Sequence, residues 1–174
     1  RLICQVQDLD GARLAQQAGA DLIVAQGTEA GGHGGTRATL PLVPAVIDAV
    51  APIPVVAAGG IADGRGLAAA LMLGAEGVLL GTRFCASAEA LGHEHSKQAL
   101  LAAKGDETLR TQVFDIVRGY GWPTGHTGRA LRNDFLARWH GREAALQEAL
   151  TDERPRYQAA SGDGDCDTAV VWAS

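Results

Sequence analysis

A short unit recurs in this chain and limits the folds that it can adopt. The stretches "AGADLIVAQG" (18–27) and "LGAEGVLLGT" (73–82) both run from a helix end through glycine, alanine and an acidic residue into an apolar strand that ends in small residues. The predicted strands are apolar almost throughout, which is typical of parallel strands buried on both faces. Repeated βα units of this kind predict an α/β fold with a parallel sheet, either doubly wound or closed into a barrel.

Four such units are expected before residue 105. The predicted strands cover 2–6, 21–27, 53–60 and 77–84, and the predicted helices cover 8–19, 42–50, 63–74 and 87–105. Asp8 or Asp10 is a candidate N-cap for the first helix, and Asp63 for the third. A closed (β/α)₈ barrel needs roughly 200 residues or more, so four units are the content of half a barrel.

The pattern changes after Gly105. Helices are expected at 106–119 and 129–139, and Leu131, Phe135 and Trp139 recur at the spacing of one packed helix face. The expected division is therefore a half-barrel domain at 1–105 and a helical extension or small second domain at 106–174. The final "AVVWAS" looks unfinished, which predicts that the second part is truncated.

The composition argues against several classes of function. The formal net charge of −5 argues against a nucleic-acid partner, which would require a basic face. No apolar run approaches the roughly 20 residues of a membrane span. Three cysteines without metal-ligand spacing are expected to be free thiols in a reducing compartment, so we expect a cytoplasmic protein without a metal site.

Three predicted strands end in small residues: "AQG", "AAGG" and "LLGT". Ligands of α/β folds bind at the carboxyl ends of strands, and neighbouring loops of a barrel commonly form a phosphate site. We therefore predict a phosphate cradle at Gly59, Gly60, Gly81 and Thr82, in which the Thr82 hydroxyl is an extra donor. The alternative for Gly59–Gly60 is a tight turn between strand and helix without a ligand.

The segment "AQGTEAGGHGG" (25–35) places His33 among glycines at the end of a strand. A neutral imidazole there is a candidate general base. Glu29 would either orient His33 or face solvent. The competing interpretation is a histidine in a mobile glycine loop.

The stretches "VAQGTEAGGHGG", "VVAAGGIADGRGL", "GVLLGTRF" and "RALRNDF" resemble the nitronate monooxygenase family. The resemblance implies a TIM barrel with a smaller helical domain, non-covalent FMN, and oxidation of alkyl nitronates by O2 to carbonyl compounds and nitrite. It implies that His33 removes the α-proton of neutral nitroalkanes. The flavin contacts implied are Gln26, Gly31 and Gly32, with Gly59, Gly60, Gly81 and Thr82 at the FMN phosphate.

The same resemblance places the chain in the second half of the barrel, because the family's first four βα units precede the segment that matches "LICQV". Such a fragment would leave open sheet edges, so we expect it to be unstable or to associate with itself. Two alternatives stay open: an FMN-dependent enoyl-acyl-carrier-protein reductase that uses NAD(P)H, and a non-catalytic fragment that binds FMN or another phosphate ligand.

Overall fold

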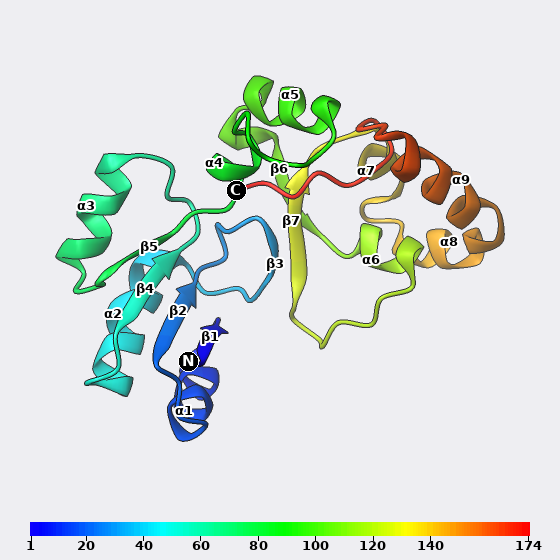
Figure 1. The fold of residues 1–174 in the computed structure, drawn as a ribbon. Helices are drawn as coiled ribbons and strands as arrows, with labels where there is room; N and C mark the ends of the chain where they lie inside the picture. Colours follow the sequence, from blue (N-terminus) through cyan, green and yellow to red (C-terminus); the bar gives the residue numbers. More distant parts are fainter. The chain divides into compact units, whose positions relative to one another are not determined.

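The computed structural model describes residues 1–174, which form two compact units, Arg1–Gly81 and Thr82–Ser174 (Figure 1). None of the helices combines the length and the apolar composition needed to cross a membrane. Cys4, Cys85 and Cys166 are free thiols, as expected.

The first unit alternates strands and helices, and four of its strands form a parallel sheet in the order β1-β2-β4-β5. Ile3 pairs with Leu22, Ile23 with Val55, and Val56 with Gly77. The four predicted strands are confirmed, although the third and the last are shorter than predicted. The elements are β1 (Ile3–Val6), α1 (Leu9–Gln17), β2 (Leu22–Gln26), β3 (Gly32–Gly34), α2 (Thr39–Val50), β4 (Val55–Ala58), α3 (Gly64–Met72) and β5 (Gly77–Leu79).

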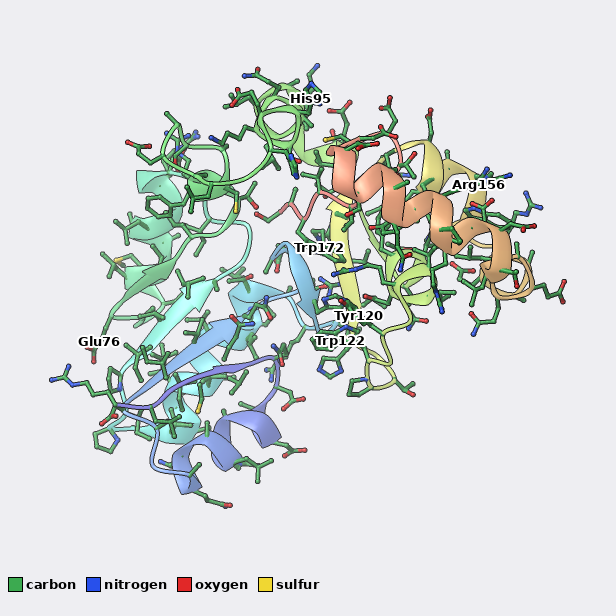
Figure 2. The ribbon with its side chains drawn as sticks, turned by 45° about the vertical axis from the view of Figure 1, so that its right-hand side comes forward. Glu76, His95, Tyr120, Trp122, Arg156 and Trp172 are labelled. Atoms are coloured by element: carbon green, nitrogen blue, oxygen red, sulfur yellow. The ribbon has the colours of Figure 1, made fainter.

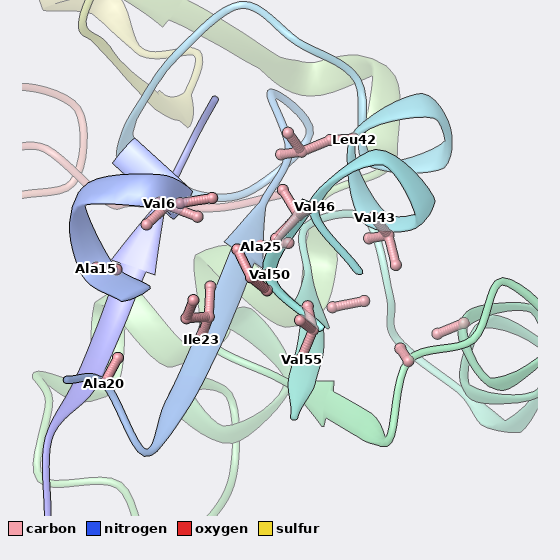
Figure 3. Packing of buried hydrophobic residues seen from close by; sticks show 14 residues of the cluster. Val6, Ala15, Ala20, Ile23, Ala25, Leu42, Val43, Val46, Val50 and Val55 are labelled. Carbon is pink, nitrogen blue, oxygen red and sulfur yellow. The ribbon is translucent and has the colours of Figure 1, made fainter. Parts of the chain in front are cut away.

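All three helices of this unit pack on one face of the sheet (Figure 3). Alternate strand residues point into that core, while Ile3 and Leu79 on the other face are 64% and 45% exposed. A doubly wound sheet carries helices on both faces, whereas the inner face of a barrel sheet carries none. The arrangement therefore favours the half-barrel. The core residues are Val6, Ala12, Ala15, Ile23, Ala25, Leu42, Val43, Val46, Val50, Val55, Ala57 and Ala70, among others.

Side-chain caps fix where two of the helices begin. The Asp8 carboxylate accepts a hydrogen bond from the backbone N–H of Gly11 at 2.7 Å, at the start of α1. Asp63 accepts from the backbone N–H groups of Arg65 and Gly66, at the start of α3. Each carboxylate satisfies N–H groups that have no partner within the helix. Of the two candidates for α1, Asp8 is the cap and Asp10 lies in the first turn, and the predicted cap at Asp63 is confirmed.

The second unit departs from its predicted elements. Antiparallel strand pairing, in which Thr108 pairs with Leu131 and Thr111 with Gly128, replaces helix in the first parts of both predicted helices. The elements are α4 (Thr82–Cys85), α5 (Glu94–Ala102), a 3₁₀ turn (Gly105–Glu107), β6 (Thr108–Thr111), α6 (Val113–Arg118), β7 (Thr127–Leu131), α7 (Asp134–Trp139), α8 (Glu143–Glu148) and α9 (Leu150–Asp163).

The predicted stripe of Leu131, Phe135 and Trp139 is therefore wrong at its first member. Leu131 belongs to β7 and packs with Val171, whereas Phe135 and Trp139 lie in α7 and join a separate core. Strand pairing between segments some 20 residues apart overrides the local helical spacing, because each ladder hydrogen bond needs a partner that the segment itself does not contain.

The core of the second unit is aromatic. Phe114 is fully buried, and its ring centroid lies 6.0 Å from Phe135 and 6.1 Å from Tyr157. Trp172, labelled in Figure 2, meets the Phe114 ring edge-on at 6.1 Å. The C-terminal segment is thus part of this core.

The predicted domain boundary at residue 105 stays a prediction. The compact units instead divide after Gly81, because Ala99 and Leu100 of α5 pack against Leu131, Val171 and Ala173. Helix α5 thus contributes to the packing of the second unit.

Candidate functional site

The carboxyl edge of the sheet carries the predicted site residues of the first unit. Gln26 pairs in register with Ala58, and Ala58 with Leu79, so β2, β4 and β5 end at the same level. The loops that follow these strands therefore begin side by side. The expectation that the strands of "AAGG" and "LLGT" are neighbours is confirmed by this register.

Gln26 ends β2 on the sheet face opposite the helices, and it is buried. Its side-chain oxygen accepts hydrogen bonds from the Nε2 atoms of Gln5 at 3.0 Å and Gln7 at 2.9 Å. Two amides from the first strand and its end therefore fix the orientation of the Gln26 carboxamide, and its own NH₂ group remains a donor on this face.

His33 lies at the centre of the short strand β3 and is half-buried. Gly32, directly before it, has a φ of +72°, and a Cβ atom there would meet nothing within 4 Å. Gly31, on the other side of that turn, is half-buried. Glycine is thus needed at position 32 for its backbone conformation, and the space beside the chain there is open.

The Gly59–Gly60 turn packs on the start of the segment that carries His33. Both glycines have positive φ, +111° and +70°. A Cβ atom on Gly59 would lie 2.9 Å from the backbone nitrogen of Ala30 and 3.1 Å from the carbonyl oxygen of Gly27. Glycine at position 59 is therefore required by packing within the protein, whether or not a ligand binds there. The backbone of Gly60, which is exposed, remains accessible.

Glu29 takes neither of the two roles considered for it from the sequence. Its carboxylate accepts hydrogen bonds from the backbone nitrogen of Thr39, at 2.9 Å, and from Thr39 Oγ1, at 2.7 Å. Thr39 is the first residue of α2, whose N-cap Ala38 supplies no side-chain acceptor. Glu29 thus caps α2 from ten residues upstream.

The amino end of α3 already holds an anion of the protein. Besides its backbone contacts, Asp63 binds Nε and Nη2 of Arg65 at 2.9 and 2.6 Å. The hydrogen bonds from the Arg65 side chain, and then those from the Gly66 and Arg65 backbones, lower the pKa of Asp63. The carboxylate satisfies the helix dipole there, so a ligand anion is better accommodated at the glycine turns than at this helix end.

Gly81 and Thr82 fall at the junction of the two compact units. Gly81 is exposed, and a Cβ atom there would meet nothing within 4 Å. Thr82 begins α4, and its Oγ1 accepts from the Ser174 backbone N–H at 3.0 Å and lies 3.0 Å from Ser174 Oγ. The hydroxyl predicted to serve a phosphate therefore also contacts the C-terminal segment.

Two residues of this edge escaped the sequence-based prediction. A Cβ atom on Gly27 would fall 2.0 Å from Thr39 Oγ1, and Thr39 Oγ1 lies 3.1 Å from the carbonyl oxygen of Gly59. The sequence offered one signal, a threonine just before an apolar helical stretch, which is typical of helix starts.

A separate hollow of about 420 Å³ lies in the second unit, between α7 and α9. The charged side chains that line it pair with one another: the Glu153 carboxylate forms ion pairs with the guanidinium groups of Arg138 and Arg156. Arg156, which lies in α9, is labelled in Figure 2. No predicted site residue lies in this hollow.

Comparisons with known proteins agree with the sequence motifs. The model of the family described as nitronate monooxygenase matches residues 2–174. A nitronate monooxygenase of Metarhizium robertsii is 44% identical over 151 residues, which cover 82% of this chain and 42% of that protein. The chain spans about half the length, or less, of the curated relatives that it matches.

Two solved structures also match the fold of this chain over nearly its whole length. The structure of FabK from Thermotoga maritima has a TM-score of 0.84 at 35% identity and covers 100% of this chain and 53% of that one. Nitroalkane oxidase from Streptomyces ansochromogenes has a TM-score of 0.78 at 36% identity and covers 99% of this chain and 50% of that one. The predicted α/β class, a partial barrel of four βα units with an extension, is confirmed. The chain belongs to the nitronate monooxygenase family.

Proposed function

We propose that this chain supplies the catalytic histidine and the phosphate-binding turns of an FMN-dependent enzyme that oxidises alkyl nitronates with O2. One observation carries the proposal. The segment that contains His33 packs directly on the Gly59–Gly60 turn at the carboxyl edge of the sheet, where a Cβ atom on Gly59 would lie 2.9 Å from the Ala30 nitrogen. The candidate base and the candidate anion-binding turn thus belong to segments that pack against each other.

The residues present fit a flavin phosphate. Main chain is uncovered at Gly32 and Gly81, where side chains would fill open space, and Gly60 is exposed. The Glu29 side chain lies beside the Gly59–Gly60 turn, but its carboxylate accepts hydrogen bonds from Thr39, so it already has donors within the protein. Backbone N–H groups in glycine turns are suitable donors for a phosphate dianion.

In this proposal FMN, when bound, supplies the redox chemistry between substrate and O2. The chain binds and orients it: Gly59, Gly60, Gly81 and Thr82 hold the phosphate, and Gln26, Gly31 and Gly32 lie against the ring system. His33, in its neutral form, accepts the α-proton of a neutral nitroalkane on an imidazole nitrogen. A nitronate has already lost that proton, so its oxidation does not need this step.

The test uses the full-length protein and its His33→Ala variant. The visible spectrum as purified reports bound flavin, and oxygen uptake is measured with a nitroalkane and with its nitronate. We expect a flavin spectrum, a loss of about 10²–10⁴-fold in kcat/KM for the nitroalkane, and a change of only a few-fold for the nitronate. Equal losses on both substrates would contradict the role of His33 as base.

The same preparation tests the alternative. The FabK structure matches this chain as closely as the nitroalkane oxidase structure does. Bound flavin that is reduced rapidly by NAD(P)H, with loss of an enoyl thioester and no oxygen uptake on nitronate, would favour the enoyl reductase. Tight FMN binding without turnover on either substrate class would favour a non-catalytic binding role.

A further inference from the structure

Glu29 and Thr39 join three segments of the candidate site. Glu29 belongs to the loop that leads to His33, Thr39 begins α2, and Thr39 Oγ1 lies 3.1 Å from the carbonyl oxygen of Gly59. A Cβ atom on Gly60 would lie 3.1 Å from the Cβ of Glu29. The Glu29–Thr39 pair is thus the place where the His33 loop, the helix and the Gly59–Gly60 turn meet.

The Thr39 hydroxyl has one proton and three oxygen atoms within hydrogen-bonding distance, of which the Ala58 carbonyl oxygen, at 3.5 Å, is the most distant. Glu29 Oε2 lies at 2.7 Å and the Gly59 carbonyl oxygen at 3.1 Å. The carboxylate is both nearer and charged, so it takes the proton. An amide at position 29 can still accept from the Thr39 backbone N–H and hydroxyl through its oxygen, but it carries no charge, so it holds the hydroxyl proton less strongly against the competing Gly59 carbonyl. The charge of Glu29 therefore sets how the turn is held.

We propose that Glu29 is a positioning residue that, through Thr39, aligns the Gly59–Gly60 turn with the segment that carries His33. The inference rests on the function proposed above. It predicts that one carboxylate affects both FMN phosphate binding and proton abstraction by His33, although its hydrogen bonds go to Thr39. A helix cap with no further role would affect only stability.

The experiment compares full-length wild type with Glu29→Gln, Thr39→Val, Thr39→Ser and the control Glu76→Gln. Glu76 is an exposed carboxylate that precedes β5, at the amino edge of the sheet (Figure 2). Apo-protein is titrated with FMN and, separately, with riboflavin, which lacks the phosphate, and flavin fluorescence is followed. The second readout is the ratio of kcat/KM for a nitroalkane to that for its nitronate.

Glu29→Gln and Thr39→Val are expected to raise the Kd of FMN about tenfold and to leave the Kd of riboflavin within about twofold, a difference of about 1.4 kcal/mol in phosphate recognition. The activity ratio is expected to fall by a similar factor. Thr39→Ser, which keeps the hydroxyl, should restore wild-type values, and Glu76→Gln should match wild type. A variant that combines Glu29→Gln and Thr39→Val should bind FMN no more weakly than Thr39→Val alone, because both changes break one connection.

Three outcomes overturn the inference. In the first, Glu29→Gln unfolds at a lower temperature but keeps the wild-type FMN affinity and activity ratio, which makes Glu29 a cap only. In the second, FMN and riboflavin lose affinity equally, which indicates general damage. In the third, Glu29→Gln does not fold and Thr39→Val behaves like Thr39→Ser. A wild type that binds no flavin and consumes no oxygen would instead overturn the proposed function, and this inference with it.

Discussion

The main chain of Gly27 lies directly against Thr39. A Cβ atom built on Gly27 would fall 2.0 Å from Thr39 Oγ1 and 2.4 Å from the Thr39 backbone nitrogen, closer than Cβ contacts occur in proteins. The Gly27 N–H donates to the Ala58 carbonyl at 2.9 Å, so the residue cannot move away without breaking the connection to β4. The end of β2 and the start of α2 can approach this closely only when residue 27 is glycine.

Gly27→Ala is therefore expected to lower the free energy of unfolding by about 3 kcal/mol, at the upper end of overpacking effects, since backbone atoms must yield. The control is Gly64→Ala, at the first position of α3, where a Cβ atom meets nothing within 4 Å. It should be neutral or stabilising by about 0.5–1 kcal/mol. Urea unfolding measures both, and similar values for the two variants would refute the argument from close approach.

The aromatic core of the second unit depends on Phe114. The side chain is fully buried among Phe135, Tyr157 and Trp172. Phe114→Ala should lower the free energy of unfolding by about 3–5 kcal/mol, because it removes buried area and leaves a cavity. Phe84→Ala, at a phenylalanine that is 63% exposed, should change it by about 0.5 kcal/mol or less. Thermal and urea unfolding distinguish the two, and a comparable loss for both would contradict the assignment of this core.

Glu153 is a buried carboxylate with three donors around it. It binds Arg138 Nη2, Trp139 Nε1 at 3.3 Å and Arg156 Nη1 at 3.4 Å. Glu153→Ala should cost about 1–3 kcal/mol of stability, the penalty for donors left without an acceptor. The loss stays below that of a fully buried pair, because the Arg138 side chain is 49% exposed and can be solvated. Glu148→Ala, at an exposed position of α8, is the control for urea unfolding, and an equal effect would count against the prediction.

The buried hydroxyl of Tyr157 makes the stability of the protein depend on pH in the alkaline range. Burial raises the pKa of its hydroxyl, although the hydrogen bond from the Val170 N–H, at 3.2 Å, opposes this. The folded protein thus keeps the phenol proton at a pH where the unfolded chain loses it. The free energy of unfolding must therefore fall as pH rises above about 10, the value for the unfolded chain.

Tyr157→Phe keeps the ring and removes both the acceptor for Val170 and this titration. At pH 8 it should be less stable than wild type by about 1 kcal/mol. Between pH 9 and 11 that difference should shrink, because only wild type loses the contribution of the buried phenol. Urea unfolding at several pH values checks this, and a difference that stays constant to pH 11 would refute it.

Local signals predicted the first unit well. Runs of apolar residues predicted β1, β2 and β4, because strands of a parallel sheet have to be apolar along their length. Asp8 and Asp63 were recognised as caps because the N–H groups they bind lie two or three residues along the chain. The repeated βα units also predicted that β4 and β5 are neighbours, whereas the register of Ala58 with Leu79 is known only from the structure.

Local sequence signals did not predict the strands of the second unit or the contact between Glu29 and Thr39. The β6–β7 ribbon joins residues 108–111 to 128–131, and its hydrogen bonds depend on a partner strand that no local pattern identifies. The sequence by itself determined the βα order, two of the helix caps and the positions of His33 and the glycine turns, since these depend on neighbouring residues. The tertiary structure alone decided that Glu29 caps α2 through Thr39, and that Gly27 and Gly59 must be glycine. These contacts form only when segments distant in the chain are packed against one another.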